Sequence, residues 1–188
     1  MVHFSWFQLG AFLAVGILAL LLIVWAVSRV AAVVPSALEK RGYPSGVGGL
    51  LLLVVVFMWL MAVSPLFRLG REGAEAVRVA FMDSAYTWAA LSTLIPDLVS
   101  ALLLTIAAFM LTAGRSPRAL YGAVLLGWLG GPCGAFLRSY FLNISLTITG
   151  EPSALVVAMF VASLYLLFSA RSQLTYALPA AYQLPERG

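Results

Sequence analysis

The charged residues best placed to do chemistry are Asp97 and Arg138, because both fall inside long apolar stretches of the sequence. Asp97 lies about 17 residues before the turn at 114–118 and Arg138 about 20 residues after it, which at about 1.5 Å per helical residue is roughly 25 and 30 Å. Antiparallel helices joined by this turn would bring the two side chains to a similar depth. A charge near mid-membrane costs about 2.5–3.5 kcal/mol, so we expect the two to pair.

Two roles for this intramembrane polar pair are open. The first is a proton or solute relay, in which Pro96 and Pro132 loosen the backbone around it. The second is a structural ion pair, or an Arg138 side chain that simply extends to the lipid headgroups. Replacing Asp97 by Asn distinguishes them, since a relay would lose transport while a structural pair would lose assembly.

Other reactive residue types are too few for catalysis or metal binding. His3 is the only histidine and Cys133 the only cysteine, and they lie far apart in the sequence. This excludes a Cys/His metal cluster, haem held by two histidines of the chain, and a Ser-His-Asp set in the apolar core. No phosphate-binding Gly-x-x-x-x-Gly-Lys motif occurs. We predict no catalytic residues, no cofactor, no metal and no enzyme activity, with Cys133 as a small buried apolar side chain.

The composition indicates that a bilayer surrounds the chain. Of its 188 residues, 63% are hydrophobic and 10% are charged, and the mean hydropathy is +1.03. Soluble domains carry about 25% charged residues, and a chain of this length could not bury so much apolar surface. Its apolar runs are continuous, which favours helices over a β-barrel. The net charge of +4 is small and scattered, so no nucleic-acid partner is expected.

We therefore predict an all-α transmembrane bundle in which residues 1–188 form a single membrane domain. The predicted spans are residues 9–27, 47–67, 88–113, 119–144 and 153–170. Pro65 should end or kink the second span. Ser36 and Glu39 resemble a capping box and predict a short helical turn in the connector at 31–46.

Residues 71–85 predict an additional amphipathic helix. An apolar stripe recurs there at spacings of three and four, formed by Ala74, Val77, Phe81 and Ala85 and continued by Trp88. We expect this helix to lie on the outer membrane surface. A lid packed over the bundle is the alternative.

Charge placement predicts that the N-terminus lies outside and the C-terminus inside. The proposed inner segments hold seven cations and the outer segments three, and cytoplasmic loops are enriched in Lys and Arg. The inner set is Arg29, Lys40, Arg41, Arg115, Arg118, Arg171 and Arg187, and the outer set is Arg68, Arg71 and Arg78.

Small residues mark the middle of the fourth span. Gly127, Gly130, Gly131 and Gly134 form two overlapping small-x-x-x-small patterns, which allow helices to approach closely. Pro132 follows directly and predicts a break in the helix. This face either packs against another helix of the same chain or forms a docking groove for a partner subunit, a pigment or a lipid tail.

Two short motifs carry a resemblance to a known family. The second span begins Gly46-Val-Gly-Gly-Leu-Leu51, and the last span ends in a pattern formed by Tyr165, Ser169, Arg171, Thr175 and Tyr176. Over roughly residues 46–176 the chain resembles the YdgK-like family, which begins with Gly-Gly-Trp-Leu and ends with Tyr-x-x-x-Ser-x-Arg-Val-x-x-Thr-Phe. Leu50, Ser172 and Tyr176 differ from the Trp, Val and Phe usual there.

The resemblance implies a multi-pass protein of the bacterial cytoplasmic (inner) membrane, with the first span as an addition to the family's four. It implies no biochemical activity. Arg171 at the inner end of the last span would serve as a topological anchor or would recognise lipid or a partner. The scarcity of polar residues inside the membrane, the glycine face and the outer amphipathic helix favour an accessory or assembly subunit of a membrane complex, whose partners are lipids and other subunits. A small transporter or lipid-handling protein using Asp97 and Arg138 is the alternative.

Overall fold

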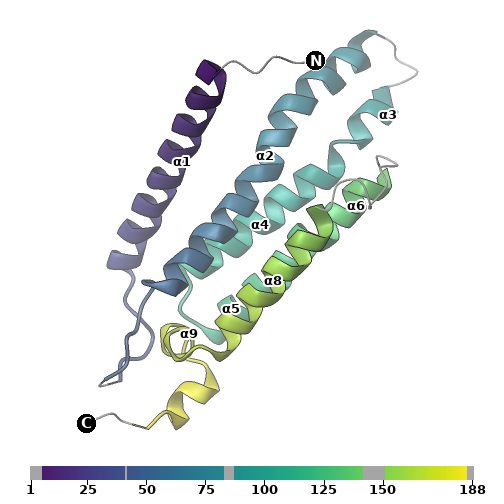
Figure 1. Ribbon diagram of the computed structural model, residues 1–188. Coiled ribbons are helices and arrows are strands. Elements are labelled where there is room, and N and C mark those ends of the chain that lie inside the picture. The colour runs from purple at the N-terminus through teal and green to yellow at the C-terminus, as the bar shows by residue number, and fades with distance from the viewer. Residues whose placement is uncertain (1–5, 41, 83–86, 142–150, 186–188) are drawn as a thin grey trace.

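A computed structural model of the chain describes residues 6–40, 42–82, 87–141 and 151–185. In these ranges every regular element is a helix, which agrees with the predicted all-α bundle (Figure 1). The elements are α1 (Trp6–Val33), α2 (Leu50–Met82), α3 (Thr87–Ser92), α4 (Ile95–Ala113), α5 (Pro117–Trp128), the π-helix η2 (Leu129–Cys133), α6 (Gly134–Phe141), α8 (Glu151–Phe168), α9 (Ala170–Thr175) and the 3-10 helix η3 (Pro179–Gln183).

Within the described residues, four helices are long and apolar enough to cross a membrane. They comprise Gly16–Val33, Leu50–Val79, Ile95–Ala113 and Pro117–Tyr140, and a fifth apolar helix, Ser153–Phe168, is shorter. Their shared core is built from Leu51 and Met58 of α2, Leu111 of α4, Leu120 of α5 and Met159 of α8. In Figure 1, α2 runs beside α4 along the bundle, while α1 stands to one side.

The second span does not end at Pro65. Instead α2 continues through this buried proline to Met82. The whole helix has 33 residues and is about 50 Å long at 1.5 Å per residue, well beyond a hydrocarbon core of about 30 Å. Pro65 supplies no N–H to the carbonyl of Met61, but in membrane helices neighbouring helices and Ser or Thr side chains tolerate such a gap. Packing of α2 against its neighbours therefore outweighs the proline.

The separate surface helix predicted at 71–85 is consequently wrong over its described part. Residues 71–82 are the last turns of α2, and 83–85 lie outside the described residues. Val77 and Phe81 of the predicted apolar stripe are exposed, so this stripe does not pack over the bundle as a lid.

The third and fourth spans each contain a backbone irregularity. The predicted helix at 88–113 is divided into α3 and α4 at Thr93 and Leu94, because Pro96 occupies the first turn of α4. The predicted break at Pro132 is instead the π-helix η2, a local widening that keeps the helix continuous. Cys133 at its end is exposed, so its predicted burial is wrong. Residues 142–144 of the predicted fourth span lie outside the described residues.

The connector between α1 and α2 contains no helix in its described residues 34–40 and 42–49, so the predicted capping box at Ser36 is wrong. The chain is held by α9 instead. The amides of Ala37 and Leu38 donate to the carbonyls of Thr175 and Leu174 at 3.2 and 3.1 Å. Carbonyls at a helix C-terminus have no partner within the helix, and the connector supplies the missing donors.

Arg115 joins this connector to the turn between α4 and α5. Its guanidinium donates to the carbonyls of Val34 and Pro35 at 3.1 Å each, and to Thr112 O at 3.0 Å. Burial lowers the pKa of Arg115, and nearby Tyr176 opposes this shift. We call this end of the bundle, marked by residues 114–116, the turn end. The opposite end, where Asp97 and Arg138 lie, is called the cluster end.

Candidate functional site

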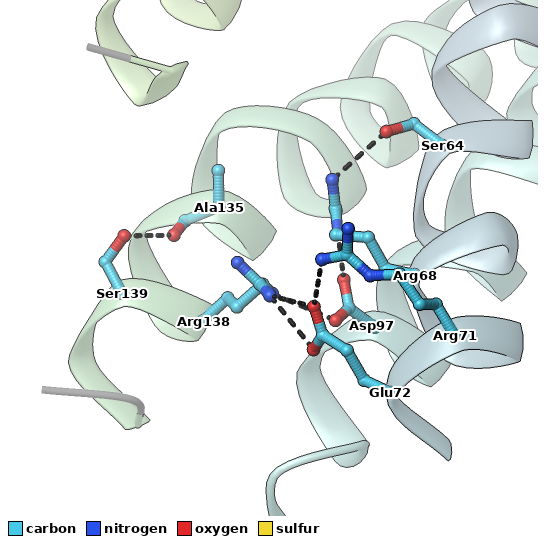
Figure 2. A network of polar contacts seen from close by, with 8 residues as sticks. All are labelled: Ser64, Arg68, Arg71, Glu72, Asp97, Ala135, Arg138 and Ser139. Atoms are coloured by element: carbon cyan, nitrogen blue, oxygen red, sulfur yellow. Dashed lines mark hydrogen bonds and ion pairs between the residues drawn. The ribbon is translucent and has the colours of Figure 1, made fainter. Parts of the chain in front are cut away.

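A cluster of charged side chains lies at the cluster end, between α2, α4 and α6 (Figure 2). Asp97 Oδ2 accepts from Arg138 Nε at 3.0 Å, and Asp97 Oδ1 accepts from Arg68 Nε at 2.9 Å. Arg138 Nη2 also lies 2.9 and 3.0 Å from the two carboxylate oxygens of Glu72. Arg71 lies 3.4 Å from Glu72. These five residues are the charge cluster.

The elements place these charges favourably. Asp97 is in the first turn of α4 and Arg138 in the last turn of α6, where the partial charges of the helix ends favour an anion and a cation respectively. The side chain of Asp97 is only 3% exposed. A carboxylate buried this deeply needs charged partners, and two arginines supply them.

The structure thus places Asp97 and Arg138 in direct contact and adds partners that sequence reasoning missed. The sequence predicts Arg68 in an outer segment beyond the second span and Glu72 in a separate surface helix at 71–85, because Pro65 is expected to end or kink the span before them. Their spacing of four residues was the available signal, since it places both side chains on one face of a helix that continues past the proline.

In the charge cluster, the arginines occupy the carboxylate oxygens that would otherwise be open to a proton or a solute. Both oxygens of Asp97 accept from guanidinium groups, so an incoming solute or proton would have to compete with an arginine. Arg68 Nη1 additionally donates to Ser64 Oγ at 3.0 Å. The arrangement connects three helices through charge-assisted hydrogen bonds, which are stronger than neutral ones.

A cavity of about 320 Å³ lies directly beside the charge cluster. We call it the lateral cavity, because it lies between α2 on one side and η2, α4, α6 and α8 on the other. Its walls are mainly apolar, including Phe57, Met61 and Leu155, and its polar groups are Ser64, Ser100 and Arg68. Both backbone irregularities in these helices, Pro65 and the η2 residues Gly130 and Gly131, line it as well.

The predicted glycine face packs inside the chain. A Cβ atom added to Gly127 would lie 2.7 Å from Met159 Cε, and one added to Gly131 would lie 2.6 Å from Met61 Cε. At Gly134 the nearest atom would be Ser100 Oγ, at 2.0 Å. Neighbouring helices of the same chain therefore pack closely against this face at these three positions, while Gly130 and Gly131 also line the lateral cavity.

The residues of the C-terminal motif form the junction at the turn end. Ser169 caps α9 by accepting from the amide of Ser172 at 3.2 Å, and Thr175 Oγ1 donates to the carbonyl of Arg171 at 2.7 Å. The fully buried Tyr176 donates from Oη to the carbonyl of Leu111 in α4 at 2.6 Å. Tyr165 packs against the core.

The two motifs behind the family resemblance contact each other. Arg171 Nε donates to the carbonyl of Gly46 at 3.2 Å. A Cβ atom on Gly48 or Gly49 would lie 3.2 or 2.5 Å from the guanidinium nitrogens of Arg171. Gly49 also has a φ of +55°, a conformation that favours glycine. The positive φ therefore favours glycine at position 49, and the guanidinium of Arg171 packs closely against both Gly48 and Gly49.

Among the described residues, no group of three or more His, Cys, Asp or Glu side chains could hold a metal ion; His3 lies outside these residues. Comparisons with family models, with curated proteins and with solved structures found no match for this chain. The resemblance to the YdgK-like family therefore stays a prediction from the sequence motifs.

Proposed function

We propose that this chain is a non-enzymatic, multi-pass protein of the bacterial inner membrane that serves as an accessory or assembly subunit of a larger membrane complex. Five spans with the N-terminus outside and the C-terminus inside are part of the proposal. The surplus of cations at the turn end supports this orientation.

The observation that carries the proposal is the weak attachment of α1. Among its described side chains, at 14 and 16–33, only Val27 is buried. A cavity of about 320 Å³ lies between α1 and the rest of the bundle, lined by Leu22, Val30 and Trp59. Helices in a membrane associate through close packing rather than through the hydrophobic effect. An apolar helix so loosely packed on its own bundle is available to helices of another subunit.

The remainder of the chain supports a structural role. Both oxygens of Asp97 accept from Arg68 and Arg138, and neighbouring helices pack closely against the glycine face. The other helices thus pack into one bundle, and α1 lies beside it. The family resemblance likewise implies that the first span is an addition to the family's four.

Site-specific photo-crosslinking in the native membrane tests this proposal. A photoreactive residue at Leu21 of α1 should give a discrete adduct with another protein. Leu102 of α4 is the matched control, since the two leucines are 59% and 60% exposed. We expect no protein adduct from Leu102. Lipid adducts alone from both positions would overturn the subunit proposal.

The alternative is a small transporter or lipid-handling protein, and the lateral cavity beside the charge cluster is the observation that favours it. In a transporter, replacing Asp97 by Asn would abolish a transport phenotype while the protein remained folded and correctly assembled. Loss of assembly without a separate transport phenotype would assign the charge cluster a structural role.

A further inference from the structure

The bundle contains the same hydrogen-bonded unit twice. Trp59 Nε1 of α2 donates to Thr112 Oγ1 of α4 at 2.9 Å, and Trp128 Nε1 of α5 donates to Ser163 Oγ of α8 at 3.0 Å. Each hydroxyl donates in turn to the carbonyl four residues before it, at 2.7 Å in both cases. Each unit therefore joins a helix that leads away from the turn end to one that returns to it. We call α2 and α4 the first hairpin, and α5–η2–α6 and α8 the second hairpin.

The correspondence extends along the first helix of each hairpin. Leu60 and Leu129 follow the two tryptophans, and Arg68 and Arg138 lie nine and ten residues after them. The extra residue falls where η2 replaces the α-helix, because i→i+5 bonding accommodates one more residue per turn. Both arginines reach the same carboxylate, where Arg68 Nε contacts Oδ1 of Asp97 and Arg138 Nε contacts Oδ2. The second hairpin is thus a structural repeat of the first.

Helix α1 lies over the tryptophan unit of the first hairpin. Trp59 and Thr112 line the apolar cavity of about 320 Å³ whose opposite wall is α1, with Ile23 and Val27 among its residues. Because α1 leads toward the turn end, it is antiparallel to α2 and parallel to α4 (Figure 1). The outer surface of the first hairpin therefore contacts one apolar helix across its tryptophan and its threonine.

The corresponding surface of the second hairpin is exposed. Val56 and Leu125 each lie three residues before the tryptophan of their hairpin, yet Val56 is 5% exposed and Leu125 is 60% exposed. One turn earlier, Leu52 packs against the core, whereas its counterpart Tyr121 is 51% exposed. We call this surface of the second hairpin the second helix site. It is formed by Tyr121, Leu125, Trp128 and Ser163.

Helix α1 also has an apolar stripe that its own bundle leaves exposed. Leu18, Leu21 and Trp25 recur at spacings of three and four, and they are 59%, 59% and 60% exposed. Successive helical residues are about 100° apart around the axis, so this stripe lies on the side of α1 opposite Ile23 and Val27. One α1 helix can therefore contact a second chain through the stripe while it stays on its own first hairpin.

We propose that the second helix site binds α1 of a second copy of this chain, through the stripe of Leu18, Leu21 and Trp25. Repeats of the parallel type keep each helix in the same direction relative to the membrane. With all copies in one orientation, α1 meets α5 and α8 of the neighbouring copy in the directions in which it meets α2 and α4 of its own. The two copies contribute different surfaces, and such heterologous contacts form rings when the rotation closes.

This inference rests on the proposed function in one respect, since it takes α1 as the helix that meets another subunit. It goes further by identifying that subunit as a second copy and by locating the surface that receives α1. The second-copy assignment follows from the repeat, because the second helix site reproduces a surface that α1 already contacts within the chain.

Photo-crosslinking between two differently tagged copies in the native membrane tests the contact. A photoreactive residue at Leu125 of one copy should form an adduct with the other tagged copy, and mass spectrometry should locate this adduct in α1. Leu102 of α4, which is also 60% exposed, is the matched control position and should give no adduct between copies. Absence of such an adduct from Leu125, or equal yields at the two positions, would overturn the inference.

The reciprocal label separates this inference from the subunit proposal. A photoreactive residue at Leu21 should label α5 or α8 of the second copy. Leu125→Ala should reduce this adduct several-fold and Leu102→Ala should not, and both changes are at exposed positions that the fold tolerates. An adduct of Leu21 with a different protein, and none between copies, would overturn the inference and leave the subunit proposal standing. Lipid adducts alone from Leu21 and Leu125 would overturn both.

Discussion

Asp97 is held by three separate features of the fold. Asp97 lies in the first turn of α4, where the helix dipole favours an anion, and Arg68 and Arg138 approach from α2 and α6. Each feature alone would offset only part of the free energy required to bury a carboxylate. Together they make Asp97 the residue on which the cluster end depends.

Replacing Asp97 by Asn should therefore destabilise the protein by about 3–5 kcal/mol, because two partly buried arginines lose their common partner. Thermal unfolding in detergent, followed by tryptophan fluorescence, measures the change. Glu72→Gln is the control: its side chain is 31% exposed, and exposed ion pairs contribute about 1 kcal/mol or less. Equal losses from the two variants would contradict the central position of Asp97.

Tyr176 gives the fold a dependence on pH, because burial raises the pKa of its hydroxyl. In the unfolded chain this group ionises near its ordinary pKa of about 10. The stabilisation is thus complete below pH 10 and decreases above it, by up to about 1.4 kcal/mol per pH unit. Tyr176→Phe should lack this dependence. Parallel unfolding curves of the two proteins between pH 8 and about 11 would contradict it.

At the scale of the helices, the spacing between α4 and η2 is set by glycine. A Cβ atom on Gly130 would lie 3.1 Å from the backbone carbonyl oxygen of Ser100 and 3.0 Å from Leu103 Cβ. A backbone atom cannot rotate away, so one of the two helices must move.

We expect Gly130→Ala to destabilise the protein by about 1–3 kcal/mol through overpacking. Gly16→Ala in α1 is the matched control, because no atom lies within 4 Å of its added Cβ. There the change should be neutral or stabilising by up to about 1 kcal/mol. Denaturation of both variants in detergent measures the two changes in stability. Similar changes would show that helix propensity outweighs packing at Gly130.

The sequence predicted the positions of the apolar helices well, because hydrophobic length is a property of each segment alone. The proximity of Asp97 and Arg138 was also predictable, since a short turn fixes their relative depth. The course of the chain at Pro65 and Pro132 was not. A proline removes one hydrogen bond wherever it occurs, and whether the helix continues is decided by neighbouring helices, which a single sequence does not reveal.

Considered as a whole, the molecule is joined differently at its two ends. At the cluster end the helices are connected by ion pairs between side chains. At the turn end Arg115, Tyr176 and Lys40 donate to backbone carbonyls, and Lys40 Nζ contacts the carbonyls of Tyr182 and Leu184 in the C-terminal segment. The hydrogen bonds at the turn end therefore do not depend on which side chains the accepting residues carry, because backbone carbonyls accept them. The ion pairs at the cluster end require specific side chains on both partners.

This difference predicts which contacts hold the connector of α1 against the bundle. The connector from α1 reaches the bundle through Arg115 and through the amides of Ala37 and Leu38. Arg115→Gln should loosen the connector and increase hydrogen exchange of these two amides. Arg118→Gln, an exposed arginine nearby, should leave their exchange unchanged. If Arg115→Gln also leaves it unchanged, α9 alone holds the connector, and the freedom of α1 to meet a partner is set by α9 rather than by the turn between α4 and α5.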